Sequence, residues 1–302
     1  MNGYLHPRYA WSLAEFGRPR QLPHCGGWIL ERRIPGLADR DAMGCYPLFA
    51  CQDWSGLERD LAEIKDEGRI VSLTLVTDPF GEYKLAFLLR CFGAMMPFKD
   101  HFVVDLQRSI NDSVSRHHRY YARRALKKVA VEMCYNSLQF LDEWPSLYAT
   151  LIERHRLVGI KAFSRLAFAR QLSVPGLVIF RARSQGVTVG AHWWYVQRNV
   201  AYSHLAAFSP LGYELMASYA LYWSAITYFA DQVGWLDLGG GAGLRRKNGD
   251  GLSQFKRGWA SGTRTSYLCG LVVNPERYED ITRRAGLLTT DYFPAYRQGE
   301  WG

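Results

Sequence analysis

The sequence has few cysteines and no long apolar segment, and each absence excludes a class of protein. Its 302 residues include six cysteines, which form no Cys-x-x-Cys pair and no spacing typical of a metal site. Isolated cysteines in a chain of this length are typical of core positions in a reducing compartment. Residues 1–20 do not resemble a signal peptide, and no window approaches the roughly 18 apolar residues of a transmembrane helix. We therefore expect a cytoplasmic protein that binds no metal.

The glycine-rich stretch 239–243 lacks the fingerprints of nucleotide-binding folds. Gly239 and Gly241 match the first two glycines of Gly-x-Gly-x-x-Gly, but Leu244 occupies the third position, and no Gly-Lys-Ser/Thr follows. The segment 244–251 is polar and turn-like, so it predicts no helix whose N-terminal amides would bind phosphate. The glycines instead predict a turn or bulge with positive φ angles.

Positive charge is the main excess in the composition. The chain has 37 Lys and Arg residues against 28 Asp and Glu, a formal net charge of +9. This excess favours a polyanionic partner such as RNA, nucleotide phosphates or an anionic membrane. A basic protein without such a partner fits the charge equally well.

Residues 115–128 concentrate this charge without a single acidic residue. Their spacing predicts a helix with cations at i, i+3/i+4 positions along one face. The basic residues on or beside that face are Arg116, Arg119, Arg123, Arg124 and Lys127. Such a stripe suits the phosphate backbone of a nucleic acid and predicts binding that weakens steeply with salt. The alternative is a solvated charged face, although such faces usually mix both signs.

Hydrophobic periodicity predicts an α/β protein with two units. In the first part, strands at 28–34, 44–52, 69–78 and 99–106 alternate with helices at 54–68 and 82–96. In the second part, helices at 141–159 and 164–173 precede three strands that span 175–208. Two-residue turns join these strands and predict an antiparallel meander. A long apolar helix over 213–234 then leads into a strand at 235–239.

Several motifs together resemble the FemABX peptidyltransferases, members of the GNAT-like acyltransferase superfamily. They are FVVDL at 102–106 before the basic helix, LYATLIERH at 147–155, and WLDLGGGAG with GDGLSQFKRGW inside 235–259. The resemblance implies a mixed α/β (α+β) fold of two tandem GNAT-like units, with a central, mostly antiparallel sheet flanked by helices. We expect an N-terminal arm (1–23), a degenerate first unit (24–108), a second unit with the catalytic loop (109–275) and a C-terminal tail (276–302).

The resemblance implies transfer of an aminoacyl group from aminoacyl-tRNA to an amine of a small molecule or peptide, with formation of an amide bond. Attack on the ester carbonyl places negative charge on its oxygen, and a fixed cation lowers that barrier. The family's Phe-Lys pair assigns this cation to Lys256, with Phe255 packed behind it at the edge of a strand.

The remaining site residues are assigned less directly. His204 is a candidate general base because imidazole titrates near neutrality, but a buried histidine hydrogen-bonded in the core explains it as well. His192 is a weaker candidate, and the family does not require a protein base. The residues that we expect to contact substrate or its phosphates are Tyr202, Asp237, Arg245 and Arg246.

The choice of donor depends on a loop that the sequence lacks. GNAT acetyltransferases bind the pyrophosphate of CoA at a glycine-rich turn between a strand and the following helix. In the equivalent junction, 206–221, Gly212 is the only glycine, and Pro210 removes a backbone amide. This favours aminoacyl-tRNA as the donor and predicts a tRNA partner without a cofactor. An acyl-CoA-dependent N-acyltransferase and a non-catalytic binding module on the same fold remain alternatives.

Overall fold

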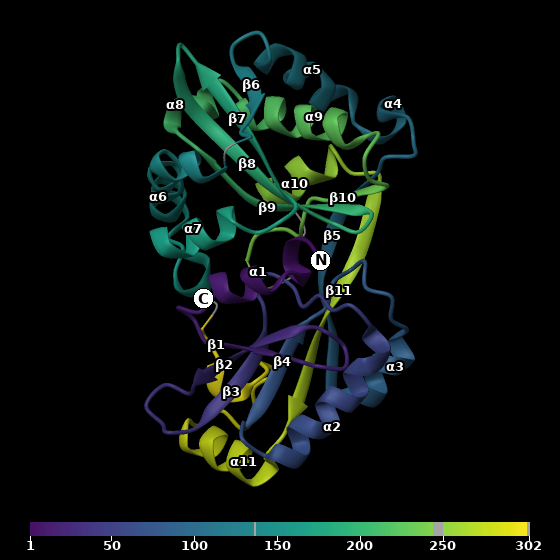
Figure 1. Cartoon of the computed structure of the whole chain (residues 1–302), viewed down its shortest axis with the longest axis vertical. Helices are drawn as coiled ribbons and strands as arrows, with labels where there is room; N and C mark the ends of the chain where they lie inside the picture. Colours follow the sequence, from purple (N-terminus) through teal and green to yellow (C-terminus); the bar gives the residue numbers. More distant parts are fainter. Residues whose placement is uncertain (136, 244–249, 301–302) are drawn as a thin grey trace. The chain divides into compact units, whose positions relative to one another are not determined.

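Figure 1 shows the computed structural model, which describes residues 1–135, 137–243 and 250–300. The chain divides into two compact units. Unit 1 comprises Met1–Arg8 and Asp100–Arg264, and unit 2 comprises Tyr9–Lys99 and Thr265–Gly302. The chain passes from one unit to the other within strands β5 (Ala94–Asp105) and β11 (Gly262–Val272). Within the described ranges, no helix is both long and apolar enough to cross a bilayer.

Unit 1 is built on a mixed sheet with the strand order β5-β10-β9-β8-β7-β6. Its antiparallel meander consists of β6 (Ala130–Met133), β7 (Leu177–Ser184), β8 (Val187–Gln197) and β9 (Val200–Phe208). The short strand β10 (Trp235–Asp237) runs parallel to β9 and antiparallel to β5. The meander predicted over 175–208 is therefore confirmed.

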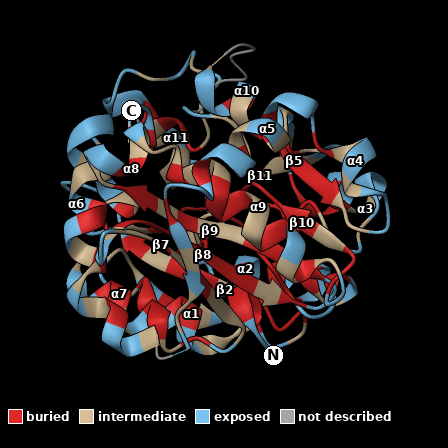
Figure 2. Cartoon of the chain, turned by 90° about the horizontal axis from the view of Figure 1, so that it is seen from above, coloured by how far each residue is buried: buried red, intermediate tan, exposed pale blue. Residues whose placement is uncertain are grey.

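Helices cover both faces of this sheet. Trp193 and Trp194 are neighbours on β8 and so point to opposite faces. On the Trp194 face, α9 (Ala217–Phe229) packs against the sheet and against α5 (Arg116–Ala125). On the Trp193 face, α6 (Trp144–His155) stacks Trp144 on Trp193 with 4.4 Å between ring centroids. Strand β8 is consequently buried along almost its whole length (Figure 2).

The other helical segments of unit 1 are short. They are η1 (Gly3–Leu5), α4 (Ile110–Ser113), η3 (Ser137–Asp142), η4 (Gly159–Lys161), α7 (Arg165–Leu172), α8 (Pro210–Glu214) and α10 (Gly251–Arg257). The long helix expected over 213–234 is divided at Met216, whose φ of 59° ends α8 before α9 begins. The predicted basic helix begins at Arg116, because the Ser115 side chain caps it by accepting from the His118 amide.

Unit 2 has its own sheet portion, with the strand order β1-β2-β3-β4-β11. Strands β1 (Arg18–Gln21), β2 (Trp28–Arg33) and β3 (Arg40–Gly44) form an antiparallel meander. Strand β4 (Ser72–Val76) runs parallel to β3 and antiparallel to β11. Helices α1 (Pro7–Ser12), η2 (Trp54–Gly56), α2 (Leu57–Glu67), α3 (Leu85–Cys91), α11 (Pro275–Arg284) and η5 (Ala295–Arg297) complete the list.

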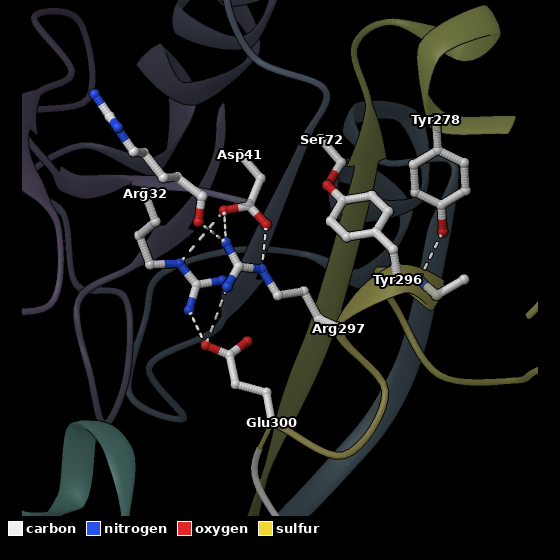
Figure 3. A network of polar contacts seen from close by, with 9 residues as sticks. Arg32, Asp41, Ser72, Tyr278, Tyr296, Arg297 and Glu300 are labelled. Atoms are coloured by element: carbon white, nitrogen blue, oxygen red, sulfur yellow. Dashed lines mark hydrogen bonds and ion pairs between the residues drawn. The ribbon is translucent and has the colours of Figure 1, made fainter. Parts of the chain in front are cut away.

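Buried charges attach the C-terminal segment to β2 and β3 (Figure 3). Arg297 donates to both oxygens of Asp41, at 2.7 and 2.9 Å, and to the carbonyl of Arg33 at 2.7 Å. Arg32, the cross-strand neighbour of Asp41, reaches Glu300 at 2.5 Å. Asp41 is 1% exposed and Arg297 7%, so these charges are satisfied by one another rather than by water.

The structure divides the two ends of the chain differently from our expectation. Residues 1–23 form η1, α1 and β1 instead of an extended arm, because Tyr4, Tyr9 and Leu13 are buried and β1 pairs with β2. The expected tail, 276–302, contains most of α11 and belongs to unit 2 together with 9–99. The helix expected over 82–96 ends at Cys91, and β5 begins at Ala94.

Candidate active site

Strands β9 and β10 separate where β10 ends. Their last paired residues are Tyr202 and Asp237, whereas β9 continues to Phe208. From Ser203 onward, the ladders of the described chain pair β9 with β8 alone. The C-terminal ends of parallel strands are where open α/β sheets bind ligands, because backbone groups and side chains are freed there.

The glycine segment after β10 requires glycine for two reasons. Gly239 has a φ of 75°, in the left-handed region that side chains disfavour. A Cβ on Gly241 would lie 2.2 Å from Ser253 Oγ, so the segment packs directly against α10. The positive φ angles predicted for this stretch are confirmed at Gly239 and Gly243.

Lys256 lies on α10, and its ammonium points back to the glycine segment. Its side chain is 8% exposed, and Nζ donates to the carbonyl of Gly240 at 2.7 Å. A Cβ on Gly239 would come within 3.2 Å of the same nitrogen. The expected strand edge around this lysine is wrong: Asp250 caps a helix by accepting from the Ser253 amide at 2.8 Å.

Phe255 anchors α10 to the core of unit 1. Its ring lies 5.0 Å from Tyr219 and 5.1 Å from Tyr222 of α9, measured between centroids. Its carbonyl accepts from Nε2 of His118 at 2.9 Å, and burial lowers the pKa of that imidazole. A neutral His118 on α5 therefore fixes the backbone next to Lys256 without adding a second positive charge.

His192 of β8 and Ser203 of β9 form a polar pair near Lys256. Nε2 of His192 lies 2.8 Å from Ser203 Oγ, and Tyr222 hydrogen-bonds the same serine. Burial, assisted by the positive charge of Lys256, lowers the pKa of His192 to about 3. His192 is thus neutral at physiological pH and too weak a base to take a proton from an amine.

Asp237, the last residue of β10, is paired with a histidine of β5. His101 Nδ1 lies 2.8 and 3.0 Å from the two oxygens of Asp237, and the Gly239 amide donates to Oδ1 at 2.7 Å. The aspartate is 2% exposed and the histidine 8%. Asp237 therefore orients His101 and the glycine turn, which is a role different from the substrate contact that we expected.

His204 and Tyr202 lie among aromatic residues around η1. His204 Nδ1 is 3.1 Å from the Tyr4 hydroxyl, and Nε2 is 3.2 Å from Gln171 Oε1. Burial lowers the pKa of His204 to about 3. Tyr202 is 3% exposed and meets Tyr4 edge to face at 5.5 Å. Both side chains act as core residues here, and the base role expected for His204 does not fit its engaged nitrogens.

Two candidate phosphate ligands cannot be placed. Arg245 and Arg246 lie outside the described residues. Their expected contact with donor or acceptor phosphates stays a prediction from the sequence.

One group in unit 2 has the composition of a metal site. Ligand atoms of His24, Asp60 and Glu63 lie within 4.8 Å of one another. The oxygens of Asp60 accept from the amides of His24 and Cys25 at 3.0 and 2.7 Å, and Glu63 lies 2.7 Å from His24 Nε2. These hydrogen bonds explain the cluster as a structural link between α2 and the segment before β2.

Comparison with known proteins relates this geometry to a known fold. Residues 113–257 match the family model described as an acetyltransferase (GNAT) domain, a range that ends just after Lys256. Two solved structures are each 15% identical to the chain. The C-terminal domain of a putative lysylphosphatidylglycerol synthetase from Agrobacterium fabrum has a TM-score of 0.67, with 95% of this chain and 93% of that one covered. FemX has a TM-score of 0.64, with 93% and 95% covered. No curated protein sequence matches the chain.

The chain has a FemABX-like GNAT fold. The family resemblance and the expected fold class are therefore confirmed, and the fold is of the acyltransferase type. Within this fold, strands β9 and β10 and helix α10 carry the candidate site described above.

The junction between β9 and α8, where the sequence lacks the glycine-rich turn of GNAT acetyltransferases, uses one of its backbone amides within the chain. Ser209 caps α8 by accepting from the Gly212 amide at 3.1 Å, and Pro210 follows at the first helical position. A Cβ on Gly212 would lie 2.0 Å from the carbonyl of Val189, so this turn packs tightly on β8. The one glycine of the junction therefore serves packing, and its amide is engaged.

The basic helix α5 keeps its cations at the surface. Arg116, Arg123, Arg124 and Lys127 are exposed, and Arg119 hydrogen-bonds the side chain of Asn111. Across the described ranges, none of these five cations forms an ion pair. His118, Ala122 and Ala125 occupy the buried face. The helix thus presents an uncompensated positive face, as the sequence predicts.

Sequence reasoning missed two elements of the site. His101 and Asp237 are 136 positions apart, so no spacing pattern joins them. The Ser203 partner of His192 was likewise invisible, because strand register decides which side chains meet. The cap at Asp250 was the one local signal available, since an aspartate three residues before Ser253 is typical of a helix start.

Proposed function

We propose that this protein transfers an aminoacyl group from aminoacyl-tRNA to the amine of a small molecule or peptide. The observation that carries the proposal is the buried ammonium of Lys256, held at the carbonyl of Gly240 where β9 and β10 separate. A lysine ammonium has three donors, so one can remain on Gly240 while another binds the carbonyl oxygen under attack.

The chemistry requires this cation when the amine attacks. Addition to the ester carbonyl converts its oxygen into an oxyanion, and a donor fixed in a water-poor site stabilises that charge without reorganisation. Phe255 and His118 fix the backbone at Lys256, and Gly240 fixes its nitrogen, so the ammonium is oriented before substrate arrives.

Two observations support a tRNA donor. The exposed face of α5 and the turn after it offer Arg116, Arg123 and Lys127 to a phosphate backbone without competing carboxylates. At the junction between β9 and α8, the Ser209 cap engages the Gly212 amide and Pro210 lacks one, which leaves fewer amides for a pyrophosphate. In addition, one structural neighbour is described as a putative lysylphosphatidylglycerol synthetase, a name that refers to a lysyl group.

Acyl-CoA is the alternative donor, since the matched family model is described as an acetyltransferase domain. The deciding experiment is mass spectrometry of products after incubation with a pool of charged tRNA and a panel of amines, beside parallel reactions with acetyl-CoA and longer acyl-CoA. An aminoacyl mass gain that depends on charged tRNA supports the proposal. A gain with acyl-CoA alone assigns the alternative, and no gain with either donor favours a binding module.

A further inference from the structure

A histidine–aspartate pair lies beside the candidate oxyanion site and has no part in the reaction so far. We infer that His101 is the general base that deprotonates the attacking amine, and that Asp237 is the residue that positions it. This assignment rests on the proposed amide-forming transfer. It names a group in unit 1 that the fold brings to the same glycine turn as Lys256.

The pair is fixed by three hydrogen bonds. His101 Nδ1 lies 2.8 Å from Asp237 Oδ2 and 3.0 Å from Oδ1, and the Gly239 amide donates to Oδ1 at 2.7 Å. Val103 and Asp237 are cross-strand partners, and His101, two residues before Val103, lies on the same face of β5. The carboxylate is therefore anchored by backbone as well as by the imidazole.

The geometry leaves the second ring nitrogen for a substrate. A carboxylate accepts hydrogen bonds, so Nδ1 carries the proton and Nε2 keeps its lone pair. Of the residues that the structure describes, none hydrogen-bonds Nε2, and 10% of the His101 side chain is exposed against 2% for Asp237. An aspartate that fixes the tautomer in this way also stabilises the imidazolium that forms when Nε2 takes a proton.

The pair and Lys256 border one short segment of backbone. The Phe102 amide, next to His101, donates to the carbonyl of Gly239 at 3.1 Å. Lys256 Nζ donates to the next carbonyl, that of Gly240, at 2.7 Å. The His101 segment and Lys256 thus contact two consecutive carbonyls of the glycine turn, and we infer that the base and the oxyanion donor act on the nucleophile and the carbonyl oxygen of one reacting group.

The other buried histidines of unit 1 do not fit this role. The pKa of His192 and that of His204 are each lowered to about 3 by burial, so both are very weak bases. His118 donates from Nε2 to the carbonyl of Phe255, and its Nδ1 lies 2.9 Å from Ser115 Oγ. His101 is distinguished from these three by its carboxylate partner, whereas a ring nitrogen without a hydrogen bond within the described structure is also found in His192, at a fully buried Nδ1.

The step balances without a further reactant. The amine nitrogen attacks the ester carbonyl carbon, a C–N bond forms, and His101 Nε2 takes the N–H proton as the oxyanion develops at Lys256. The ester C–O bond then breaks, the amide carbonyl re-forms, and the imidazolium returns the proton to the departing oxygen. The products are the amide and the free hydroxyl of the donor, and His101 is again neutral.

The test compares His101→Ala, His101→Gln and Asp237→Asn in the full-length protein. We expect kcat for amide formation to fall about 100-fold or more in both His101 variants, with a much smaller change in the acceptor KM. Added imidazole should restore activity to His101→Ala, whose side chain leaves room for it, and not to Lys256→Met. Asp237→Asn should also lose activity, because the amide no longer fixes the tautomer.

The pH profile gives a second readout. Strand β5 lies between β10 and β11, whose charged side chains are Asp237 and Arg264, and Arg257 of α10 lies over the ring of Phe102. The charged residues of β5 itself are Lys99, Asp100 and Asp105. We expect an acidic limb in the wild-type kcat profile that disappears in His101→Gln. ¹⁵N NMR of the imidazoles should show the Nδ1–H tautomer for His101, independently of any substrate.

The outcomes separate this inference from the proposed function. Wild-type protein that forms no product with any donor overturns the proposed function and the base role with it. Active wild type together with normal kcat in His101→Gln overturns the base role alone. The base role is also overturned if the His101 variants lose activity but imidazole does not restore it and the pH profile is unchanged. It is overturned as well if NMR shows the Nε2–H tautomer for His101.

Discussion

Two arginine-containing helices of ten residues, one in each unit, use their arginines in opposite ways. In α11 of unit 2, Arg277 pairs with Asp39 and Asp280, while Arg283 and Arg284 pair with acids one turn earlier. In α5 of unit 1, the described residues offer no acid to any cation. The difference shows that arginine content alone does not determine the charge of a helix surface, which depends also on neighbouring carboxylates.

The two units also differ in the partners of their buried charges. In unit 2, Arg297 and Asp41 neutralise each other and join the C-terminal segment to β3. In unit 1, Lys256 donates to Gly240, an acceptor without a full charge. The Arg297–Asp41 pair joins segments of unit 2, whereas in the reaction that we propose the ammonium of Lys256 would stabilise a developing oxyanion.

The largest effect on stability should follow from breaking the ion pair of unit 2. Arg297→Ala leaves the carboxylate of Asp41 buried, with Arg32 at 3.4 Å as its remaining cation. Removing one partner of a buried pair costs about 3–5 kcal/mol. Urea unfolding followed by tryptophan fluorescence measures this loss. The control Arg283→Ala, which removes an exposed i,i+4 pair, should cost no more than about 0.5 kcal/mol. Equal urea midpoints for Arg297→Ala and Arg283→Ala would contradict the expected difference between the buried and the exposed ion pair.

Lys256→Met should abolish most of the transfer activity with little change in stability. The loss of one oxyanion donor typically lowers kcat about 100- to 1,000-fold. Rapid-quench or product-mass assays give kcat, and the control is Arg257→Met, which removes the exposed neighbouring cation. If Lys256→Met is as active as Arg257→Met, the oxyanion role is wrong.

The buried neutral histidines predict a pH dependence of stability. The pKa of His204 falls from 6.5 to about 3 on folding, so between these values the unfolded chain binds a proton that the folded chain does not. Stability is therefore complete above pH 6.5 and decreases as pH falls, by about 2 kcal/mol at pH 5 for this one group. Urea titrations at pH 7 and pH 5 should show a smaller difference in His204→Gln than in wild type. An unchanged difference would mean that His204 is solvated.

The smallest expected effect concerns the surface helices. Arg123→Ser on α5 combined with Lys127→Ser in the turn after it should weaken tRNA binding and lower the slope of log affinity against log salt by about 1.4–1.8, the contribution of two phosphates. Arg283→Ser/Arg284→Ser on α11 is the matched control, because these cations are already paired. Filter binding between low and moderate salt measures both slopes. The same decrease in both double variants would show that net charge, rather than the face of α5, attracts the nucleic acid.

Much of the fold could be predicted, and the errors have a common cause. The meander over 175–208 and the helix ending at Gly68 follow from local turn residues and periodicity. The arm expected at 1–23 and the tail expected at 276–302 are ordered because Tyr9 and Arg297 find buried partners elsewhere in unit 2. Such partners are distant in sequence, so no local pattern reveals them.

The candidate site was predicted in part. The Phe-Lys pair and the glycine turn were found by motif, but the helix that carries Lys256 was not, because its start was assigned to a polar turn. His204 was a candidate base because imidazole titrates near neutrality, and His101 was not considered. Burial and two engaged nitrogens make it a core residue.

The sequence alone determined the residue types, the glycines that permit φ angles near 75°, and the run of cations without acids on α5. These properties are local, since they depend on a few neighbouring residues. The tertiary structure decided which histidine faces a carboxylate, where β9 and β10 separate, and that the ammonium of Lys256 is buried against Gly240. Those outcomes depend on strand register and on packing between distant segments, which a linear pattern does not contain.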